Sequence, residues 1–439
     1  MGNSTMSNDR PTGVRWNIVM MLGAISATTY VDRLNMSIAG ESIQIDLSFD
    51  TKTMGWILSA FVLGYAFFQV PGGWLGDRHG PKKVLTIALL WWSLFTGLTA
   101  LASHLPTARW FGDAWSFAII RFLIGLGEGA AFPNANKIVS LWTESSSRGL
   151  ANGIFFTGLG IGGALTPVGV TWIMVHWGWQ FSFYISAILG VLVAAMWHLY
   201  AKDRPEEHPF VNSAELAIIR SQSRCKVCEM QVVHQPTPWG RIFSNRSVWA
   251  LFISYFLIGY PIYIYYTWFF IYLVRSRQLP LSHSALWTTT PFIAVMVLAP
   301  LGGIISDWAI ARWGRRRGRQ SAAWLGISLS GIMLMAGAHV TSNMWAIVLL
   351  ACAAGFNLFA VPTWWATCID LTPEFCGSLS GVMNMCGNIG GWLSPIITAY
   401  IVTKYGWSQA LDFAALLTLA AGPLWLLINA GQSVESRLV

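Results

Sequence analysis

Four ionisable residues lie in stretches of the chain that are otherwise apolar, and their types suit proton and anion chemistry. Asp32 and Arg33 follow an uncharged run that begins at Trp16, while Arg121 and Glu128 lie seven residues apart. In a helix this spacing places Arg121 and Glu128 on one face, roughly 10 Å apart along the axis. Full charges inside a membrane cost several kcal/mol unless they are paired or hydrated, so they mark functional sites by default. The pattern predicts a site that couples anion binding to proton uptake.

A static ion pair that ties two helices together is the structural alternative for these charges. At roughly 10 Å and an effective dielectric constant of about 20, Arg121 and Glu128 interact by about 1.7 kcal/mol, which suits a switch better than a lock. An anion that engages Arg121 would release Glu128 to take up a proton, and by linkage a proton on Glu128 would favour the anion. We therefore predict proton coupling through Asp32 and Glu128, and anion binding or gating through Arg33 and Arg121.

Further polar side chains recur at the four-residue spacing that places them on one helix face. Thr363 and Thr367 show this spacing, and two tyrosines flank Pro261 in "YPIYIYYTWFFIY". Hydrogen bonding between membrane helices is the alternative explanation for such groups. The polar residues from which we predict substrate contacts are Tyr65, Gln69, Tyr260, Tyr263, Thr363, Asn384 and Asn388.

Composition places the chain in a membrane. Of 439 residues, 54% are hydrophobic and 10% are charged, whereas a soluble chain carries about 25% charged residues. A transmembrane helix needs about 20 mostly apolar residues. The sequence has twelve such runs, which start near Trp16, Met54, Val84, Trp115, Leu150, Trp179, Val248, Ala285, Ser321, Met344, Ser378 and Gln409.

Basic residues predict the orientation of these spans. With the N-terminus inside, the inner segments hold 19 Lys and Arg and the outer loops hold five, so the positive-inside rule places both termini in the cytoplasm. The net charge of +8 therefore reports topology and contact with the lipid bilayer, and does not indicate nucleic acid. The predicted segments are a cytoplasmic N-terminus 1–15, a six-helix bundle 16–200, a cytoplasmic linker 201–247 with a short helix at Ser213–Arg220 capped by Ser213, a second bundle 248–430, and a cytoplasmic C-terminus 431–439.

The two bundles repeat each other. The fifth and eleventh runs align at an offset of 228, which matches Gly149 with Gly377 and Pro167 with Pro395. The loop after the second run reads "GWLGDRHGPKK", and a copy of its Gly-x-x-x-Asp follows the eighth run at Gly303. Parallel repeats of this kind typically hold substrate between them, near the middle of the membrane. We interpret Gly73, Asp77, Arg78 and Asp307 as a conformational latch, and Lys82, Lys83 and Arg315–Arg317 as topology signals.

The loop signature resembles that of the major facilitator superfamily, and "YVDRLNMSIA" and "RFLIGLGEGAAFPNANKIVSLW" resemble its anion:cation symporter family. The resemblance implies an all-α membrane protein with twelve transmembrane helices in two pseudo-symmetric six-helix bundles. It also implies secondary transport of hexuronates, aldonates or aldarates with protons, and gives Asp32, Arg33, Arg121 and Glu128 the roles predicted above. We expect a monomer in a cell membrane, the bacterial inner membrane being the expected one.

Two departures bear on the substrate. The resemblance implies an extra cation in the seventh span for carriers of the vesicular glutamate type. This span has none, which argues against a small dicarboxylate held at both ends. Leu159 stands where sugar-acid carriers of the family often have a polar residue. A less hydroxylated acid, an anion antiporter and a transporter-like nutrient sensor are the alternatives to proton-coupled import of a sugar acid.

No enzyme, cofactor or metal site is expected. The sequence has no Gly-x-x-x-x-Gly-Lys-[Ser/Thr] nucleotide loop and no set of nucleophile and base. Cys225 and Cys228 with His234 fall short of the four ligands of a structural zinc site, so we expect reduced thiols.

Overall fold

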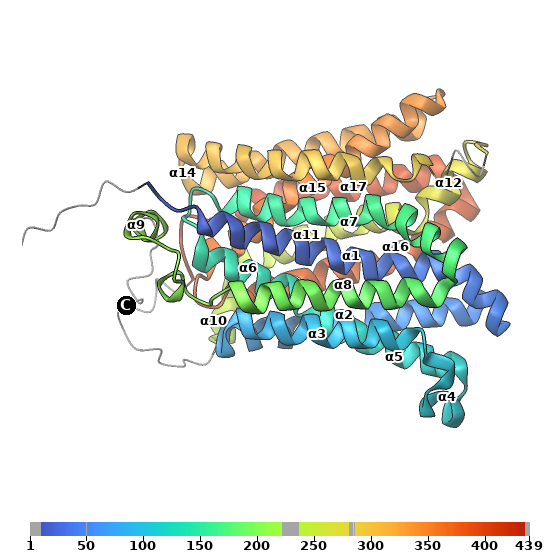
Figure 1. Cartoon of the computed structure of the whole chain (residues 1–439). Helices are drawn as coiled ribbons and strands as arrows, with labels where there is room; N and C mark the ends of the chain where they lie inside the picture. The colour runs from blue at the N-terminus through green and yellow to red at the C-terminus, as the bar shows by residue number, and fades with distance from the viewer. Residues whose placement is uncertain (1–9, 50, 222–236, 281–283, 285, 435–439) are drawn as a thin grey trace, which may run out of the picture.

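The computed structural model describes residues 10–49, 51–221, 237–280, 284 and 286–434. Its long helices run side by side in one bundle (Figure 1). Helices α9 (Ser213–Ser221) and α10 (Trp239–Ser244) lie at one end, here called the linker end, and α4 (Pro106–Phe111) and α12 (Phe269–Arg275) lie at the opposite end. Cys225, Cys228, His234, and the outermost parts of the two predicted cytoplasmic termini, lie outside the described residues.

The first half of the chain supplies six spans. Its helices are α1 (Val14–Leu47), α2 (Thr51–His79), α3 (Pro81–Thr99), α5 (Asp113–Gly129) continued by α6 (Ala131–Trp142), α7 (Arg148–Trp177) and α8 (Trp179–Tyr200).

The second half supplies the other six. Its helices are α11 (Arg246–Thr267), α14 (Thr290–His339), α15 (Asn343–Leu371), α16 (Cys376–Tyr405) and α17 (Trp407–Leu424). Helix α14 holds two spans, because Gly314, with φ 77° and ψ 167°, breaks its helical backbone in the middle. A positive φ of this size favours glycine. The change of backbone direction at Gly314 connects the eighth span to the ninth without a loop.

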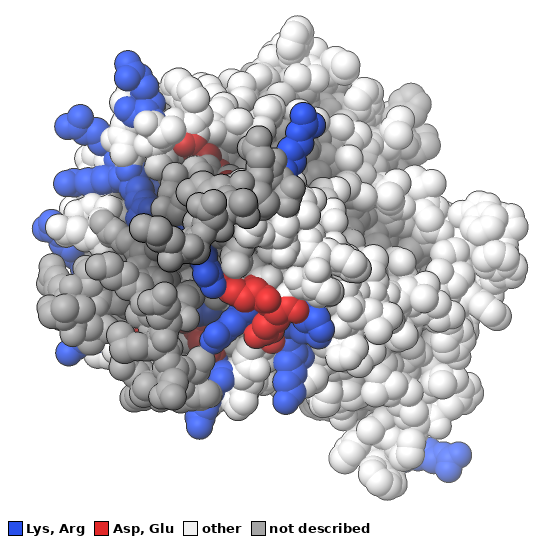
Figure 2. All heavy atoms as spheres, turned by 60° about the vertical axis from the view of Figure 1, so that its left-hand side comes forward, with Lys and Arg blue, Asp and Glu red and all other residues white. Residues whose placement is uncertain are grey.

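Nine helices in the described ranges are long and apolar enough to cross a membrane. Helices α1 and α3 and the second arm of α14 complete the twelve predicted spans. Large apolar side chains such as Leu63, Val168 and Leu199 are exposed on the flanks of the bundle, as expected where lipid replaces water. Figure 2 shows Lys and Arg side chains gathered toward the linker end, and a largely uncharged flank beside it.

Helices α2 and α5 pack backbone against backbone. A Cβ on Gly125 would collide with the carbonyl oxygen of Phe61, and one on Gly129 would lie 2.7 Å from the carbonyl oxygen of Tyr65. Small residues allow such close approach between membrane helices. This contact brings the end of α5 that carries Glu128 close to the aromatic residues Phe61 and Tyr65.

The first part of the linker packs against the first half. Helix α9 confirms the predicted short helix, but its cap is Asn212, whose Oδ1 accepts from the Glu215 amide at 3.0 Å, and not Ser213. Ser213 is already the first helical residue, so its neighbour takes the capping position. The Glu215 carboxylate in turn accepts from the Val14 and Arg15 amides at 3.1 and 3.0 Å, at the start of α1.

Candidate functional site

A central cavity lies between the two halves and encloses about 570 Å³ of empty space, including its mouth. The first half lines it with residues of α1, α2, α6 and α7, and the second half with residues of α11, α15 and α16. Among the described residues, the lining comprises Tyr30, Arg33, Tyr65, Phe132, Phe156, Leu159, Tyr255, Ile258, Gly259, Ile262, Tyr263, Tyr266, Leu358, Val361, Asn384, Gly387 and Asn388.

Arg33 reaches the cavity and is paired with Glu128. Its Nε lies 2.8 Å from Oε2 of Glu128, a carboxylate with no solvent exposure. The guanidinium also lies over the ring of Tyr65, at 4.3 Å from the ring centre, and over that of Tyr30, at 5.3 Å. Aromatic faces attract such a cation. Arg33 is therefore held at the cavity wall by one carboxylate and two tyrosine rings.

Asp32 and Arg121 lie behind this wall. Asp32 is 2% exposed, and no protein group in the described part of the chain hydrogen-bonds to either of its carboxylate oxygens. Arg121 is 3% exposed, and its guanidinium lies 4.7 Å from the ring centre of Phe61. Both interact with Glu128 through space, without a hydrogen bond to it. The sequence predicted a through-space interaction of Glu128 with Arg121, and the structure adds a direct ion pair of Glu128 with Arg33, which the sequence did not predict.

Tyrosines and asparagines complete the polar surface of the cavity. The Tyr30 and Tyr266 hydroxyls lie 2.9 Å apart across the two halves, and Asn384 Nδ2 donates to the Tyr65 hydroxyl at 3.2 Å across the same interface. Tyr263 donates to Asn388 Oδ1 at 2.7 Å. These bonds place four of the predicted contact residues, Tyr65, Tyr263, Asn384 and Asn388, at the cavity.

Three other predicted contact residues do not line it. Tyr260 bonds Thr398 at 2.8 Å inside the second half, because its position on α11 is rotated away from Gly259 and Tyr263. Gln69 is buried where α2 meets α16.

Thr363 also lies off the cavity, because α15 presents Leu358 and Val361 there. The hydroxyl of Thr367 donates to the Thr363 carbonyl at 2.7 Å. This bond runs within α15, so the spacing of the two threonines has a local explanation in the helix itself.

At the linker end, Asp77 connects the halves. Its carboxylate accepts from the Gly377 and Ser378 amides at 3.2 and 2.7 Å, at the start of α16, and forms an ion pair with Lys137 at 3.2 Å. A helix N-terminus has free amides and a partial positive charge, so a carboxylate is stabilised there. Lys137 also donates to the Pro373 carbonyl at 3.4 Å, so it makes specific contacts across the halves.

Asp307 makes the equivalent connection in the opposite direction. Its carboxylate accepts from the Gly149 and Leu150 amides at 3.0 and 2.8 Å, at the start of α7. The repeat predicted from Asp77 and Asp307 thus reappears as two reciprocal helix caps. The glycines of the signature make close backbone contact across the halves: a Cβ on Gly73 would collide with the Gly377 carbonyl oxygen.

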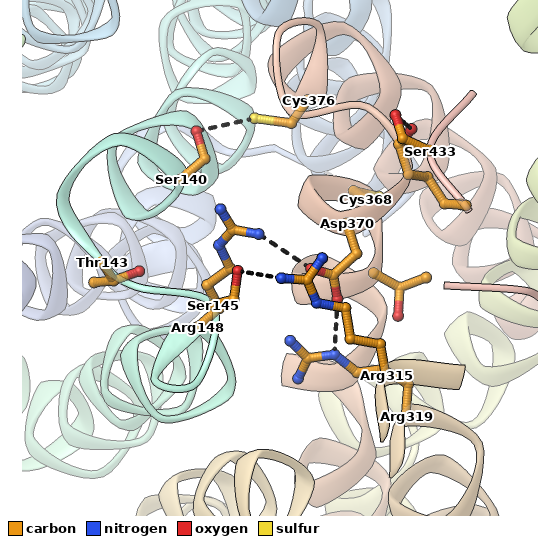
Figure 3. A network of polar contacts seen from close by, with 12 residues as sticks. Ser140, Thr143, Ser145, Arg148, Arg315, Arg319, Cys368, Asp370, Cys376 and Ser433 are labelled. Atoms are coloured by element: carbon orange, nitrogen blue, oxygen red, sulfur yellow. Dashed lines mark hydrogen bonds and ion pairs between the residues drawn. The ribbon is translucent and has the colours of Figure 1, made fainter. Parts of the chain in front are cut away.

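A chain of ion pairs ends at Asp307, and Figure 3 shows the part of it around Asp370. Arg148 of the first half binds Asp370 of the second at 3.1 Å, and Arg319 binds both Asp370, at 3.1 Å, and Asp307, at 3.3 Å. Arg315 donates to the Ser145 hydroxyl at 2.8 Å, which gives it a contact beyond its predicted topological role. Arg78 was predicted to belong to the latch, but it is exposed, with its guanidinium over Trp74 of its own helix, and it is not among the partners of Asp77 or Asp307 described above.

The comparisons with known proteins agree with this architecture. Residues 19–395 match the sequence profile of the Major Facilitator Superfamily. The chain belongs to the major facilitator superfamily. The structure is also similar in fold to the solved structure of the proton:xylose symporter XylE bound to 6-bromo-6-deoxy-D-glucose, with a TM-score of 0.76. The two chains are 14% identical, and the match covers 97% of this chain and 98% of that one.

Within the superfamily, the chain is similar to transporters of organic anions. It is 32% identical to the probable galactarate/D-glucarate transporter GudP of Bacillus subtilis, over 95% of this chain and 92% of the relative. It is 31% identical to the probable sulfoacetate transporter SauU of Cupriavidus necator, over 86% of this chain and 85% of the relative. The resemblance to this anion-transporter branch is confirmed, and the protein is a multi-pass membrane transporter and not an enzyme.

Several residues of this superfamily member went unnoticed in the sequence. Tyr255, Gly259 and Tyr266 line the cavity together with the predicted Tyr263, and the spacing of these four positions, by four, four and three residues, follows one helix face. Tyr30 precedes Arg33 by three residues and shares its face. Asp370 is an acid at the end of an otherwise apolar span, a signal of the same kind as Glu128.

Loss of the Asp77 cap is expected to open the linker end of this transporter. Asp77→Asn removes the charge from bonds worth about 1.5–3 kcal/mol each, so the halves should separate more often there. Cys376 is fully buried beside Ser140 of the first half, at 3.4 Å. With the other five cysteines replaced by serine, a membrane-permeant maleimide should label Cys376 about tenfold faster in Asp77→Asn.

The neighbouring Arg78→Gln is the matched control, because Arg78 is exposed beside Trp74, and its labelling rate should stay unchanged. An equal rise in both variants, or no rise in Asp77→Asn, would contradict a latch at this position.

Proposed function

We propose that this transporter imports a sugar acid together with protons. The similarity to probable aldarate transporters supports the substrate class. The observation that carries the proposal is the pair Arg33–Glu128: a cation at the cavity wall is neutralised by a carboxylate that does not itself line the cavity.

This arrangement makes the proton and the anion mutually dependent. With charge centres about 4 Å apart, the pair gains about 4 kcal/mol at an effective dielectric constant of about 20. A proton on Glu128 removes that attraction and leaves Arg33 free to bind the carboxylate of a substrate. Linkage requires the reverse as well, so a bound anion favours protonation of Glu128. Asp32 is the second proposed proton site, because it is buried and no described residue hydrogen-bonds to its carboxylate. Arg121 is proposed to interact electrostatically with both carboxylates from behind the wall.

Movement of the halves would carry the substrate across. The caps made by Asp77 and Asp307 and the ion pairs of Arg148 and Arg319 hold the linker end together. Breaking them would expose the cavity to that end, as in alternating access. The excess of basic residues supports a cytoplasmic linker end, with both termini on that side. The proposed working unit is a monomer in a bacterial inner membrane.

A less hydroxylated acid is the second candidate. Leu159 lines the cavity, where a polar group would be needed to bind another hydroxyl. Phe156 and Leu358 also line the cavity, so this part of its surface adds apolar contact.

Transport in proteoliposomes tests the proposal. The purified protein is reconstituted with a pH-sensitive dye inside, and D-gluconate, D-glucuronate, D-glucarate or phenylacetate is added outside at equal concentration. Uptake of a sugar acid with acidification of the lumen is expected. Sugar-acid uptake without acidification would contradict proton coupling, and uptake of phenylacetate alone would favour the second candidate.

A further inference from the structure

The number of positive charges at the cavity limits the charge of its substrate. Among the lining residues in the described ranges, Arg33 is the single charged side chain. It belongs to α1, so the positive charge lies on the wall made by the first half. The facing wall, made by α11, α15 and α16, contributes tyrosines, aliphatic residues, glycines and the amides Asn384 and Asn388.

The polar groups of the facing wall are already engaged. Tyr263 donates to Asn388 at 2.7 Å, and Asn388 donates to the Asn384 carbonyl at 2.7 Å. The Tyr255 hydroxyl accepts from Trp365 Nε1 at 3.0 Å. This wall can rearrange hydrogen bonds toward hydroxyl groups, but it has no charge to set against a second carboxylate.

An apolar recess continues the cavity and also lacks charge. It encloses about 300 Å³ of empty space and shares Leu159, Ile262, Tyr266 and Leu358 with the main cavity. Its remaining lining residues are Tyr265, Pro291, Phe292, Val295 and Ala354. A second carboxylate would find no cation by entering this space.

The nearby cations are committed elsewhere. Arg121 lies behind the ring of Phe61 and is 3% exposed. Lys137 binds Asp77, and Arg148 binds Asp370, both at the linker end. A dianion bound through Arg33 would therefore hold its second charge in a low-dielectric space without a partner, which costs several kcal/mol.

We infer that the cavity selects acids with a single anionic group, so that aldonates and hexuronates bind in preference to aldarates. The inference rests on the proposed sugar-acid transport and narrows it. It departs from the substrates named for the relative of Bacillus subtilis, which are two dicarboxylic acids.

Three matched acids test it. D-gluconate and D-glucuronate each carry one of the terminal carboxylates of D-glucarate, and all three are fully ionised at neutral pH. Binding to the purified full-length protein is measured by competition against one radiolabelled acid at constant pH and ionic strength. At least one of the two monoanions is expected to bind about tenfold or more tightly than D-glucarate.

Equal or tighter binding of D-glucarate would overturn the selectivity and leave sugar-acid transport standing. Absence of binding by all three acids would overturn the proposed function and the selectivity with it.

A charge placed on the facing wall gives a second measurement. Asn388→Lys supplies the missing cation, and the ratio of D-glucarate to monoanion affinity should rise about tenfold relative to the matched neutral variant Asn388→Gln. An unchanged ratio in a folded Asn388→Lys protein would count against the inference. The wild-type comparison decides the question if that variant does not fold.

Discussion

Arg33→Gln is expected to weaken the binding of acid substrates by at least about 30-fold. Removing one partner of a buried, hydrogen-bonded charge pair costs about 2–5 kcal/mol, which corresponds to a loss of affinity of about 30-fold to several thousandfold. Arg33 is the charged group at the cavity wall, and its ring contacts with Tyr30 and Tyr65 hold it there. Equilibrium binding of a radiolabelled acid to purified protein measures the effect.

Two controls separate binding from folding. Arg33→Gln leaves Glu128 buried without its cation, so the double variant Arg33→Gln/Glu128→Gln, which removes both charges, should recover thermal stability without recovering binding. Arg33→Lys keeps the charge but loses the planar fork that suits a carboxylate, and a loss of about tenfold is expected. Wild-type affinity in Arg33→Gln would exclude Arg33 as the anion site.

Glu128→Gln is expected to uncouple transport from protons. Glutamine keeps a hydrogen-bonding group beside Arg33 without a titratable charge, so Arg33 stays available to the anion at every pH. Exchange of internal for external substrate should persist. Accumulation driven by a pH gradient should vanish, whereas one coupled proton supports about tenfold accumulation per pH unit in the wild type.

The pH dependence of binding should change in the same variant. In the wild type, a proton on Glu128 frees Arg33, so the affinity for the anion rises as the pH falls, by up to about tenfold per unit for one linked proton. In Glu128→Gln this slope should flatten. Asp46→Asn is the matched control, because Asp46 is not a cavity-lining residue and its carboxylate accepts from Trp179 Nε1 at 2.7 Å. The Asp46→Asn variant should accumulate substrate like the wild type. Undiminished accumulation in Glu128→Gln would exclude Glu128 as the coupling group.

The fold could be predicted almost completely from the sequence. Apolar run length and basic loops depend on neighbouring residues, so they predict the twelve spans and their orientation. The repeat is found by matching two stretches of sequence, and it predicts the two equivalent carboxylates Asp77 and Asp307. The four membrane charges could be identified because each is exceptional in its stretch. The ion pair of Glu128 could not, because it depends on how α1 is rotated against α5.

That rotation is decided by packing between distant segments. Adjacent residues such as Asp32 and Arg33 point about 100° apart on a helix, and the sequence does not say which of them faces the cavity. The structure turns Arg33 into the cavity and Asp32 behind it. The pairing of Arg148 with Asp370 could not be predicted either, since the two residues lie 222 positions apart and the repeat does not match them with each other.

The attachment of α9 to the start of α1 has a practical consequence for dividing the gene. Glu215 caps α1, and Asp203 accepts from the amide of Lys82 at 2.8 Å, at the start of α3. Residues 201–221 are thus attached to the first six spans by hydrogen bonds at the starts of α1 and α3. Two coexpressed fragments should reassemble better when the break follows Ser221 than when it follows Tyr200, since the earlier break would separate two helix caps from the helices they complete.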